Sequence, residues 1–401
     1  MNLCIVNTFY YPDIIGGAEI SILKLAEGLR KNGINVIVIC TSRQDKMEII
    51  NGVKIYRIRV SNLYSPIDSK NSNYIKKILY RIVDLFNFFN YSKLKNILLK
   101  ENINIVHTNN LYGISPVIWR ICKKNNIKIV HTLRDCFLMC PRVSLLRNKK
   151  EICNNCLKIC KLYRKLNIKL SKGINLVTAP SRFTLKLFYS KGYFNNIVRK
   201  VVYNSIDFNV NEIENIYEKK LMSRNKIINF IFMGAIDYHK GIHILLKAFN
   251  NMKDPNIRLN IAGCGKLEYL VKRYSKKDSR IIYLGFLDEK QKDILLKNFN
   301  VMVVPSICYE TFGRVVIDAY KYCMPVIGSN IGGITEIIEH GQTGLLIKPN
   351  SQEELEKALT YFSNRININN MLYSVKNYIL KFDIDIQIKK FIKIYNYLLY
   401  K

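Results

Sequence analysis

Short, almost uninterrupted apolar runs alternate with amphipathic helical patterns along most of this chain. Leu3–Val6 and Val36–Cys40 are runs of this kind, and Ile20–Arg30 between them has the spacing of a helix with one apolar face. Strands that are apolar on both faces belong in a parallel sheet covered by helices on each side, because a sheet face open to water would carry alternating polar residues. The alternation therefore predicts an α/β fold built on parallel sheets.

The alternation runs twice, because a polar stretch interrupts it near the middle of the 401 residues. Residues 208–225 are rich in Asn, Glu and Lys, and a new apolar run begins at Ile228–Met233. A chain of this length also suits two domains. We expect two Rossmann-like, doubly wound domains facing a central cleft. They span residues 1–207 and 226–401, joined by a linker at 208–225, and the last helix is a candidate to cross back to the first domain.

The chain is strongly basic, with 63 Lys and Arg against 30 Asp and Glu and a formal charge of +33. Such a surplus favours phosphorylated substrates, an anionic membrane surface or nucleic acid as partners. A lysine-rich bias of the source proteome is the alternative. The basic residues are spread over the whole chain, and no stretch interleaves aromatic and basic residues for base recognition. A basic nucleic-acid-binding protein is therefore kept as an alternative, and nucleic acid is not an expected partner.

The N-terminus and the cysteines bear on location. The chain enters an apolar run without a basic segment or cleavage site, so no signal peptide is expected. No window of about 18 apolar residues offers a membrane-spanning helix. Eleven cysteines without an export signal indicate reduced thiols in a cytoplasm. We expect a cytoplasmic protein, with peripheral attachment to the inner face of the membrane as an extension of that expectation.

In doubly wound folds, ligands bind beyond the carboxyl ends of the strands, so the loops there are where functional residues are expected. The loop after Leu3–Val6 ends in Gly16 and Gly17 at the start of a helix. Paired glycines let the backbone approach a ligand closely, and the helix N-terminus offers free N–H groups to an anion. An ordinary turn is the alternative interpretation.

The second half carries a stronger set of loops. Gly234 follows one strand, and the same loop brings Lys240, which is well placed to neutralise a diphosphate. Gly263 follows the next strand. Glu310 lies in a later strand-to-helix loop, and Asp318 lies two turns into the helix that follows. Two acids that flank a helix N-terminus can hold sugar and ribose hydroxyls while free N–H groups hold phosphate. On spacing alone, a surface acid and a helix-face Asp remain the alternative.

Taken in order, these motifs resemble those of the retaining glycosyltransferases of family 4, which have the GT-B fold. The resemblance spans about residues 1–350, and its second half is the more specific. The matching segments are Gly16-Gly17-Ala18-Glu19, His107-Thr108-Asn109-Asn110, Thr132-Leu133-Arg134-Asp135, Asn204-Ser205-Ile206-Asp207, Gly234 with Lys240-Gly241, Glu310-Thr311-Phe312-Gly313 with Asp318, and residues 325–344.

The resemblance implies roles for individual residues. Glu310 matches the first acid of the E-x7-E motif, which contacts the donor sugar, and Asp318 matches the second, which holds the nucleotide ribose. Lys240 matches the lysine that binds the donor diphosphate. The remaining residues assigned to the donor site are Gly16, Gly17, Gly234, Gly263, Phe312, Gly313 and Arg314, and Arg134 and Asp135 complete the catalytic set.

Four positions depart from the family pattern. Ala235 stands where an Arg commonly partners the lysine, and Asp318 replaces the usual second Glu. Arg134 takes the place of a His, and Ser205 replaces the Gly of an Asn-Gly-x-Asp turn. A missing cation beside the leaving diphosphate weakens catalysis unless Arg134 or another cation replaces it. A degenerate, inactive member is the alternative that these departures leave open.

The implied activity is transfer of a sugar, with retention, from a UDP-, GDP- or ADP-sugar to a lipid-linked or cell-envelope glycan. Lys240 and the helix N-terminus at Gly313 would stabilise the negative charge that grows on the diphosphate in the transition state. No protein nucleophile is assigned, and no cofactor is required for transfer. A nucleotide-sugar epimerase or a glycogen-synthase-like enzyme is the alternative within the same fold.

A basic amphipathic helix is predicted around residues 75–89. Lys76 and Lys77 lie away from its apolar face, and further lysines follow closely. Such a helix can lie on an anionic bilayer, and an ordinary helix packed on the first domain's sheet is the alternative. The apolar residues are Ile75, Ile78, Leu79, Ile82, Phe86 and Phe89.

Five cysteines crowd the loop 136–160 of the first domain. Cys140, Cys153, Cys156 and Cys160 have the spacing C-x12-C-x2-C-x3-C, which supplies enough thiols for a structural zinc or an iron–sulfur cluster. The polar stretch between them has little to form a core, so a metal would explain an ordered loop. Reduced, partly buried thiols are the alternative, because the strict zinc-ribbon spacing is absent.

Overall fold

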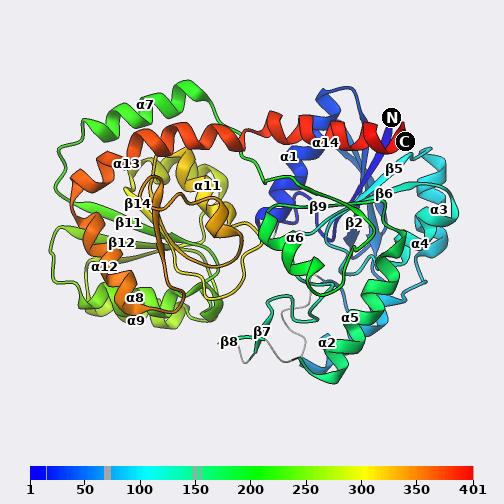
Figure 1. Ribbon diagram of the computed structural model, residues 1–401, viewed down its shortest axis with the longest axis horizontal. Coiled ribbons are helices and arrows are strands. Elements are labelled where there is room, and N and C mark those ends of the chain that lie inside the picture. Colours follow the sequence, from blue (N-terminus) through cyan, green and yellow to red (C-terminus); the bar gives the residue numbers. More distant parts are fainter. Residues whose placement is uncertain (15, 67–73, 148–150, 154–155, 401) are drawn as a thin grey trace. The chain divides into compact units, whose positions relative to one another are not determined.

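The computed structural model describes residues 1–14, 16–66, 74–147, 151–153 and 156–400. The chain divides into two compact units (Figure 1). The first consists of Met1–Leu145, Asn154–Asn204 and Ile384–Lys401, and the second of Leu146–Cys153 and Ser205–Asp383. Each unit is built on its own parallel sheet, so the prediction of two doubly wound α/β domains is confirmed.

The first unit contains an eight-stranded sheet in the order β10-β9-β6-β5-β1-β2-β4-β3, parallel except for the β3–β4 pair. The chain moves from β1 to one edge and returns to β5 on the other side of β1, so the topological switch point lies between β1 and β5. The strands are β1 (Asn2–Val6), β2 (Asn35–Ser42), β3 (Lys46–Ile50), β4 (Val53–Arg59), β5 (Ile105–Thr108), β6 (Lys128–Thr132), β9 (Leu176–Ala179) and β10 (Val198–Val201).

Helices cover both faces of this sheet. His107 of β5 is hydrogen-bonded to Tyr395 of α14, whereas the next residue, Thr108, accepts a hydrogen bond from Trp119 of α4. Successive side chains of a strand point to opposite faces, so α14 and α4 lie on opposite sides of the sheet. The helices are α1 (Gly17–Lys31), α2 (Tyr74–Leu85), α3 (Tyr91–Lys100), α4 (Val117–Lys124), α5 (Lys158–Leu170), α6 (Arg182–Tyr189), α14 (Ile384–Leu399) and the 3-10 turn η2 (Ser171–Gly173).

The second unit contains a six-stranded parallel sheet in the order β13-β12-β11-β14-β15-β16. The chain again leaves its first strand toward one edge and resumes on the other side, which places the switch point between β11 and β14. The strands are β11 (Ile228–Met233), β12 (Ile257–Ala262), β13 (Ile281–Gly285), β14 (Val301–Val304), β15 (Val326–Ser329) and β16 (Gly344–Ile347).

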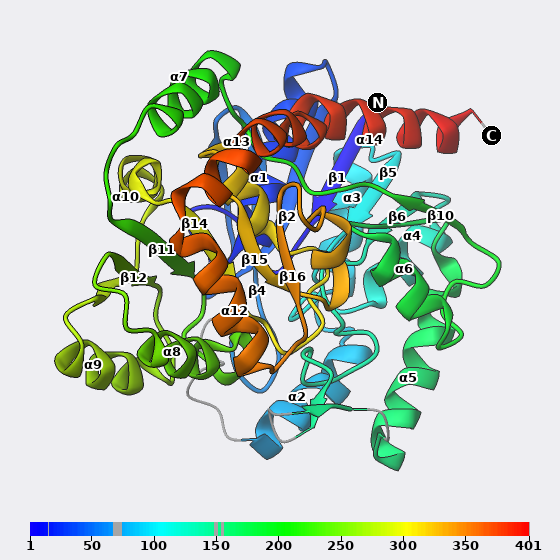
Figure 2. The ribbon, with the colours of Figure 1, turned by 60° about the vertical axis from the view of Figure 1, so that its left-hand side comes forward.

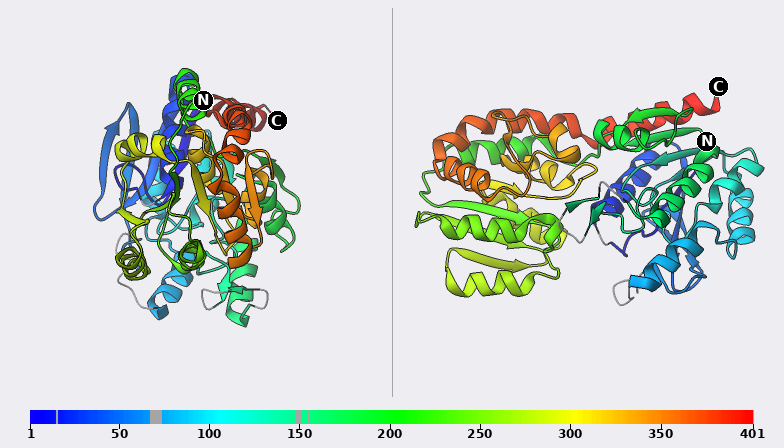
Figure 3. Two further views of the ribbon diagram at one scale, coloured as in Figure 1. Left: turned by 90° about the vertical axis from the view of Figure 1, so that its left-hand side faces the viewer. Right: turned by 60° about the horizontal axis from the view of Figure 1, so that its bottom comes forward.

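In this unit α7 and α11 pack against α13 on one face of the sheet, and α9 and α12 pack against α8 on the other (Figures 1 and 3). The helices are α7 (Val210–Leu221), α8 (Ile242–Asn251), α9 (Glu268–Lys277), α10 (Glu289–Leu295), α11 (Arg314–Lys321), α12 (Gln352–Ser363) and α13 (Arg365–Tyr378). The short elements are the 3-10 turns η3 (Tyr238–Lys240), η4 (Leu296–Asn298), η5 (Gly332–Glu336) and η6 (Ile379–Phe382), and the hairpin β7 (Leu146–Arg147) and β8 (Glu151–Ile152).

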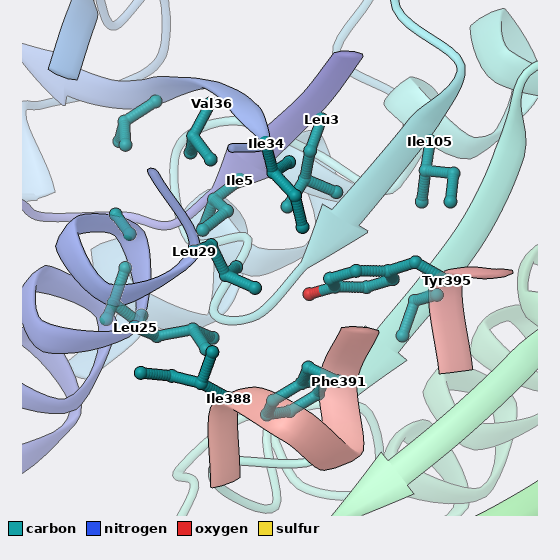
Figure 4. Packing of buried hydrophobic residues seen from close by; sticks show 14 of the residues in the cluster. Leu3, Ile5, Leu25, Leu29, Ile34, Val36, Ile105, Ile388, Phe391 and Tyr395 are labelled. Carbon is teal, nitrogen blue, oxygen red and sulfur yellow. The ribbon is translucent and has the colours of Figure 1, made fainter. Parts of the chain in front are cut away.

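The C-terminal helix α14 belongs to the first unit, although its sequence follows the second. Ile388, Phe391 and Tyr395 point toward Leu25 and Leu29 of α1 and complete the core cluster on that face (Figure 4). Burial of a side chain such as Phe391 contributes about 1.5–3 kcal/mol. The hydrophobic core therefore fixes the end of the chain on the first unit.

Two elements differ from the sequence-based expectation. The edge strand β3 was not predicted, and it turns back into β4 through Asn51-Gly52, both with positive φ, the pair that favours a two-residue hairpin. The segment 208–225, expected to be a linker, contains α7 and belongs to the second unit. The Asn209 side chain caps α7, and Ile213 and Ile216 are buried, so only two buried apolar residues mark this helix within a polar segment.

Candidate functional site

Strands β11 and β14 of the second unit (Figure 2) are neighbours in its sheet, and the strand-to-helix loops that follow them meet at the switch point. The loop after β11 runs through Lys240, and the loop after β14 runs through Glu310. The two loops are joined directly, because the backbone N–H of Ile307 donates to the carbonyl oxygen of His239 at 3.0 Å. Gly241 has a φ of 73°, and a Cβ at that position would overlap the carbonyl of Pro305. A glycine is therefore required for the loops to approach this closely.

Lys240 and Glu310, 70 residues apart in the sequence, form an ion pair in which Lys240 Nζ donates to Glu310 Oε1. Ser306 Oγ donates to the same carboxylate oxygen at 2.8 Å. The side chains of Lys240 and Glu310 are 28% and 17% exposed, so a ligand can reach both. The arrangement offers one cation and one carboxylate at the ligand-binding end of the sheet.

Each partner of this pair stabilises the charge of the other. Burial raises the pKa of Glu310, but the charge of Lys240 and the hydrogen bonds from Lys240 and Ser306 outweigh it, so the pKa lies below the ordinary value. Burial lowers the pKa of Lys240, but the charge of Glu310 outweighs it and raises the pKa above its ordinary value. Both groups are charged at neutral pH.

The backbone around Glu310 is held by the glycine pair that the sequence places before Glu336. Gly333 donates its N–H to the carbonyl oxygen of Glu310 at 2.7 Å. Gly332 has a φ of 65°, and a Cβ there would lie 2.6 Å from that same carbonyl oxygen. The two glycines of η5 therefore fix where the Glu310 loop runs.

Helix α11 begins directly after this loop, at Gly313, whose φ is 89°. Phe312 is 1% exposed and its ring packs against Phe382, so its side chain belongs to the core and is not available to a ligand. Arg314 Nε lies 3.8 Å from Oδ1 of Asp318, which is one turn further along α11. Burial raises the pKa of Asp318 above its ordinary value, although the charge of Arg314 opposes this.

Gly234 and Gly263 lie at the ends of neighbouring strands and pack backbone against backbone. Gly234 donates its N–H to the carbonyl oxygen of Ala262 at 3.0 Å, and a Cβ at Gly263 would overlap the carbonyl of Gly234. The two glycines therefore shape the loops beside the Lys240 loop rather than present side-chain chemistry.

A pocket of about 280 Å³ lies at the switch point of the first unit. It brings together Gly16 and Gly17 from the start of α1 and Asp135 from the loop after β6. Burial raises the pKa of Asp135, although a hydrogen bond from the Phe137 N–H opposes this. The lining residues are Thr8, Phe9, Gly16, Gly17, Ala18, Glu19, Arg81, Asn110, Leu111, Tyr112, Asp135 and Phe137.

Arg134 is adjacent to Asp135 in sequence but does not line this pocket. Its Nε donates to Asn109 Oδ1 at 3.0 Å, and one terminal nitrogen donates to Asn204 Oδ1 at 2.6 Å. Arg134 thus links two segments that the sequence motifs also singled out, within the first unit.

Comparisons with known proteins identify the family. The family model described as "Glycosyltransferase Family 4" matches residues 15–210, and the model described as "Glycosyl transferases group 1" matches residues 214–373. An "uncharacterized 42.6 kDa protein in cps region" of Klebsiella pneumoniae is 30% identical over 341 residues, which cover 84% of this chain and 87% of that protein. The chain is a family 4 glycosyltransferase.

Two further proteins are similar to this glycosyltransferase. The O-antigen chain mannosyltransferase C of Escherichia coli is 32% identical over 139 residues, which are 34% of this chain and 37% of that protein. The crystal structure of HepE from Anabaena in complex with UDP-glucose superposes with a TM-score of 0.71 at 17% identity, over 99% of both chains. The second likeness shows the shared GT-B fold.

The cysteine prediction has no support in the glycosyltransferase structure. Among the residues that the structure describes, no group of three or more His, Cys, Asp or Glu side chains is arranged to hold a metal ion. Cys140, Cys153, Cys156 and Cys160 are half-buried thiols that are not in disulfides in the described part of the chain, and part of the intervening sequence lies outside the described residues. The spacing alone did not determine whether the thiols converge.

Several pocket residues in the first unit were missed by the sequence reasoning. Arg81 comes from α2, and Phe9, Tyr112 and Phe137 come from loops after β1, β5 and β6. The loop residues follow parallel strands, which is the one signal that could have found them. Arg81 has no such signal, because its helix is not adjacent in sequence to any other part of the pocket.

Proposed function

We propose that this glycosyltransferase transfers a sugar, with retention of anomeric configuration, from a nucleotide-sugar to a lipid-linked or cell-envelope glycan. The observation that carries the proposal is the Lys240–Glu310 pair at the switch point of the second unit. A reachable cation and carboxylate at the ligand-binding end of a doubly wound sheet suit a ligand with a diphosphate and sugar hydroxyls.

In the proposed donor complex, the diphosphate replaces Glu310 as the partner of Lys240. The released carboxylate then accepts hydrogen bonds from hydroxyls of the donor sugar. Asp318, half-buried on α11, is assigned to the ribose, and the backbone N–H groups at Gly313 and Arg314 to phosphate. The UDP-glucose complex of the similar HepE structure supports a nucleotide-sugar as the donor class.

The proposed mechanism depends on where negative charge develops during sugar transfer. As the bond between the anomeric carbon and the diphosphate lengthens, negative charge grows on the leaving group. Lys240 and the start of α11 are already positioned by the loop contacts, so they stabilise that charge without reorganising. The acceptor hydroxyl attacks from the side of the leaving group, and a phosphate oxygen accepts its proton. No protein nucleophile and no metal are assigned to this step.

The pocket of the first unit is proposed as the acceptor site, and Gly16 and Gly17, which the resemblance assigns to the donor site, also line it. It combines aromatic rings with Asp135 and Asn110, a mixture that suits a sugar ring and its hydroxyls. The glycan class is supported by the similar proteins: one is named for a cps region and another is an O-antigen chain mannosyltransferase.

Attachment to the inner, cytoplasmic face of the membrane is part of the proposal. None of the helices in the described part of the chain has the length and apolar composition needed to cross a bilayer. Several large apolar side chains of α2 and the residues after it are nevertheless exposed, and Phe89 is 80% exposed. The side chains of Ile75 and Ile78, which the sequence also placed on this surface, lie outside the described side chains. The exposed residues are Leu79, Ile82, Val83, Phe86, Phe88 and Phe89.

Co-sedimentation with vesicles tests this attachment. We expect binding to vesicles of phosphatidylglycerol and phosphatidylcholine, and weaker binding to phosphatidylcholine alone, because basic residues add about 1 kcal/mol each near an anionic surface. Phe86→Ser combined with Phe89→Ser should reduce binding, whereas Ile366→Ser, which alters an equally exposed residue of α13, should not. Equal, negligible binding of the wild type to both vesicle types would exclude the attachment.

The activity itself is tested by product analysis. Incubation with UDP-, GDP- and ADP-sugars and a lipid-linked glycan should release nucleoside diphosphate only when the acceptor is present. NMR of the product should show the anomeric configuration of the donor. Conversion of the nucleotide-sugar without an acceptor would instead support an epimerase.

A further inference from the structure

The pocket of the first unit contains a cation, Arg81, that forms no ion pair with the residues that the structure describes. Its charge nevertheless acts on two neighbouring acids, because it opposes the burial that raises the pKa of Asp84 and of Asp135. The Arg81 guanidinium lines the pocket and packs 3.9 Å from the centroid of the Tyr112 ring. Arg81 makes no hydrogen bond or ion pair with any residue that the structure describes, and it is only half-buried. The stacking on Tyr112 fixes the plane of the guanidinium, while its N–H groups remain available to a ligand.

The two carboxylates of the pocket are held by the backbone instead. Glu19 Oε2 accepts the N–H of Gly16 at 2.8 Å, and Asp135 Oδ1 accepts the N–H of Phe137 at 2.8 Å. Both acids thus have a backbone partner, although the charge of Arg81 also lowers the pKa of Asp135 against the effect of burial. Among the twelve residues that line the pocket, Arg81 is the one cation, so it is the one lining side chain whose positive charge can pair with an acidic group of a ligand.

A second polar group in the pocket also lacks a partner. Thr8 is 3% exposed, lines the pocket, and its hydroxyl has no hydrogen-bond partner in the described part of the chain. A buried hydroxyl without a partner is costly unless a ligand or water completes its bonding. Thr8 and Arg81 both therefore indicate a polar ligand, while Phe9, Tyr112 and Phe137 offer apolar faces to a sugar ring.

We infer that the acceptor sugar of this glycosyltransferase carries an acidic group, a carboxylate or a phosphate, which Arg81 recognises. The inference rests on the proposed assignment of the pocket to the acceptor. A guanidinium binds such groups through two parallel N–H···O bonds, so Arg81 determines specificity for the acceptor without touching the reacting bond. The net charge of +33 is in keeping with an anionic acceptor.

The experiment compares acidic and neutral sugars on the full chain. The probes are methyl β-glucuronide, glucose 6-phosphate and the neutral methyl β-glucoside, with binding measured by titration NMR. The proteins are the wild type, Arg81→Gln and Arg120→Gln. Arg120 is the matched control, because it is an exposed arginine of the first unit that also lies over an aromatic ring, Phe88, outside the pocket.

We expect the wild type to bind at least one acidic sugar about tenfold more tightly than the glucoside, the effect of one charge-assisted hydrogen-bonded pair. Arg81→Gln should abolish this preference, and Arg120→Gln should retain it. No preference in the wild type, or the same loss in both variants, would overturn the inference.

A donor titration on the same three proteins separates the two sources of an anion. Stabilisation by UDP-glucose, measured as a shift in Tm, should be unchanged in Arg81→Gln. If Arg81→Gln weakens UDP-glucose binding and leaves the acidic sugars unaffected, Arg81 serves the donor diphosphate and the inference is wrong. If no nucleotide-sugar stabilises any of the proteins, the proposed function fails, while an acid preference lost in Arg81→Gln still supports the acidic-sugar site.

Discussion

The two units place a cation at their switch points in different ways. In the second unit Lys240 is paired with Glu310. In the first, Arg81 has no ion-pair partner within the described residues, and the acids beside it, Glu19 and Asp135, are held by backbone N–H groups. A paired cation must exchange its partner before it holds phosphate, whereas an unpaired cation binds an anion directly. The comparison is the basis of our two proposals, that Glu310 is released to bind sugar hydroxyls when phosphate binds Lys240, and that Arg81 selects for an acidic group on the ligand.

Removal of the carboxylate in the second unit should have the largest effect. Glu310→Ala is expected to lower kcat/KM for transfer on the order of 100-fold, because a positioned contact to the donor sugar is lost. Glu353→Ala is the control, since it breaks the exposed Lys357–Glu353 pair on α12 of the same unit. Steady-state transfer rates are measured at saturating acceptor concentration, and circular dichroism verifies that each variant is folded. Near wild-type turnover by folded Glu310→Ala would show that the pair does not serve the donor.

Displacement of the carboxylate, without removal, should have a smaller effect. Gly332→Ala places a Cβ 2.6 Å from the carbonyl oxygen of Glu310, so the loop must shift, and we expect about a tenfold rise in the KM for the donor. Gly341→Ala imposes the same kind of backbone strain, at a φ of 79°, but meets no atom within 4 Å. A similar loss of stability in both variants with a raised KM only in Gly332→Ala would support the account. Equal KM values in the two variants would show that η5 does not position Glu310 for donor binding.

A second buried lysine of the second unit, Lys220, shows how burial changes a lysine pKa when carbonyl groups, rather than a carboxylate such as Glu310, accept its hydrogen bonds. Lys220 is 7% exposed, and its Nζ donates to the carbonyl oxygens of Phe299 and Tyr322, both at 2.6 Å. Burial lowers the pKa of Lys220 to about 7, whereas Glu310 raises the pKa of Lys240.

Because the folded state binds the Lys220 proton less tightly than the unfolded state, unfolding takes up a proton between about pH 7 and the ordinary lysine pKa. The free energy of unfolding contributed by this group therefore rises with pH across that range, by about 1 kcal/mol per pH unit. Urea titrations from pH 6 to pH 9 should show the wild type gaining stability relative to Lys220→Met, with transfer activity little changed. A pH-independent difference would mean that Lys220 stays charged when folded.

Much of the fold was accessible from the sequence because most of the buried parallel strands are continuous apolar runs, separated by stretches with helical spacing. The exceptions have local causes. The edge strand β3 is half-exposed, so Lys46–Ile50 lacks a continuous apolar run. Helix α7 buries few residues in a polar segment. Nothing in the cysteine spacing showed whether the four thiols converge.

The residues of the candidate sites also divide into those that could be predicted from the sequence and those that could not. Lys240 and Glu310 could be placed at strand ends from the sequence, because a polar loop follows each apolar run. Their direct pairing depends on β11 and β14 being neighbours, which only the sheet order reveals. Arg81 could not be predicted, because α2 reaches the pocket through tertiary packing and carries no motif.

The central claim is that Lys240 exchanges Glu310 for the diphosphate of a nucleotide-sugar, and donor binding tests it most directly. Isothermal titration with UDP-, GDP- and ADP-sugars should give one class that binds the wild type, and Lys240→Ala should weaken that binding at least tenfold, since a charge-assisted contact to phosphate is lost. Lys357→Ala, which removes the exposed lysine of the pair on α12, should bind like the wild type. Equal donor affinity of Lys240→Ala and Lys357→Ala would contradict the account.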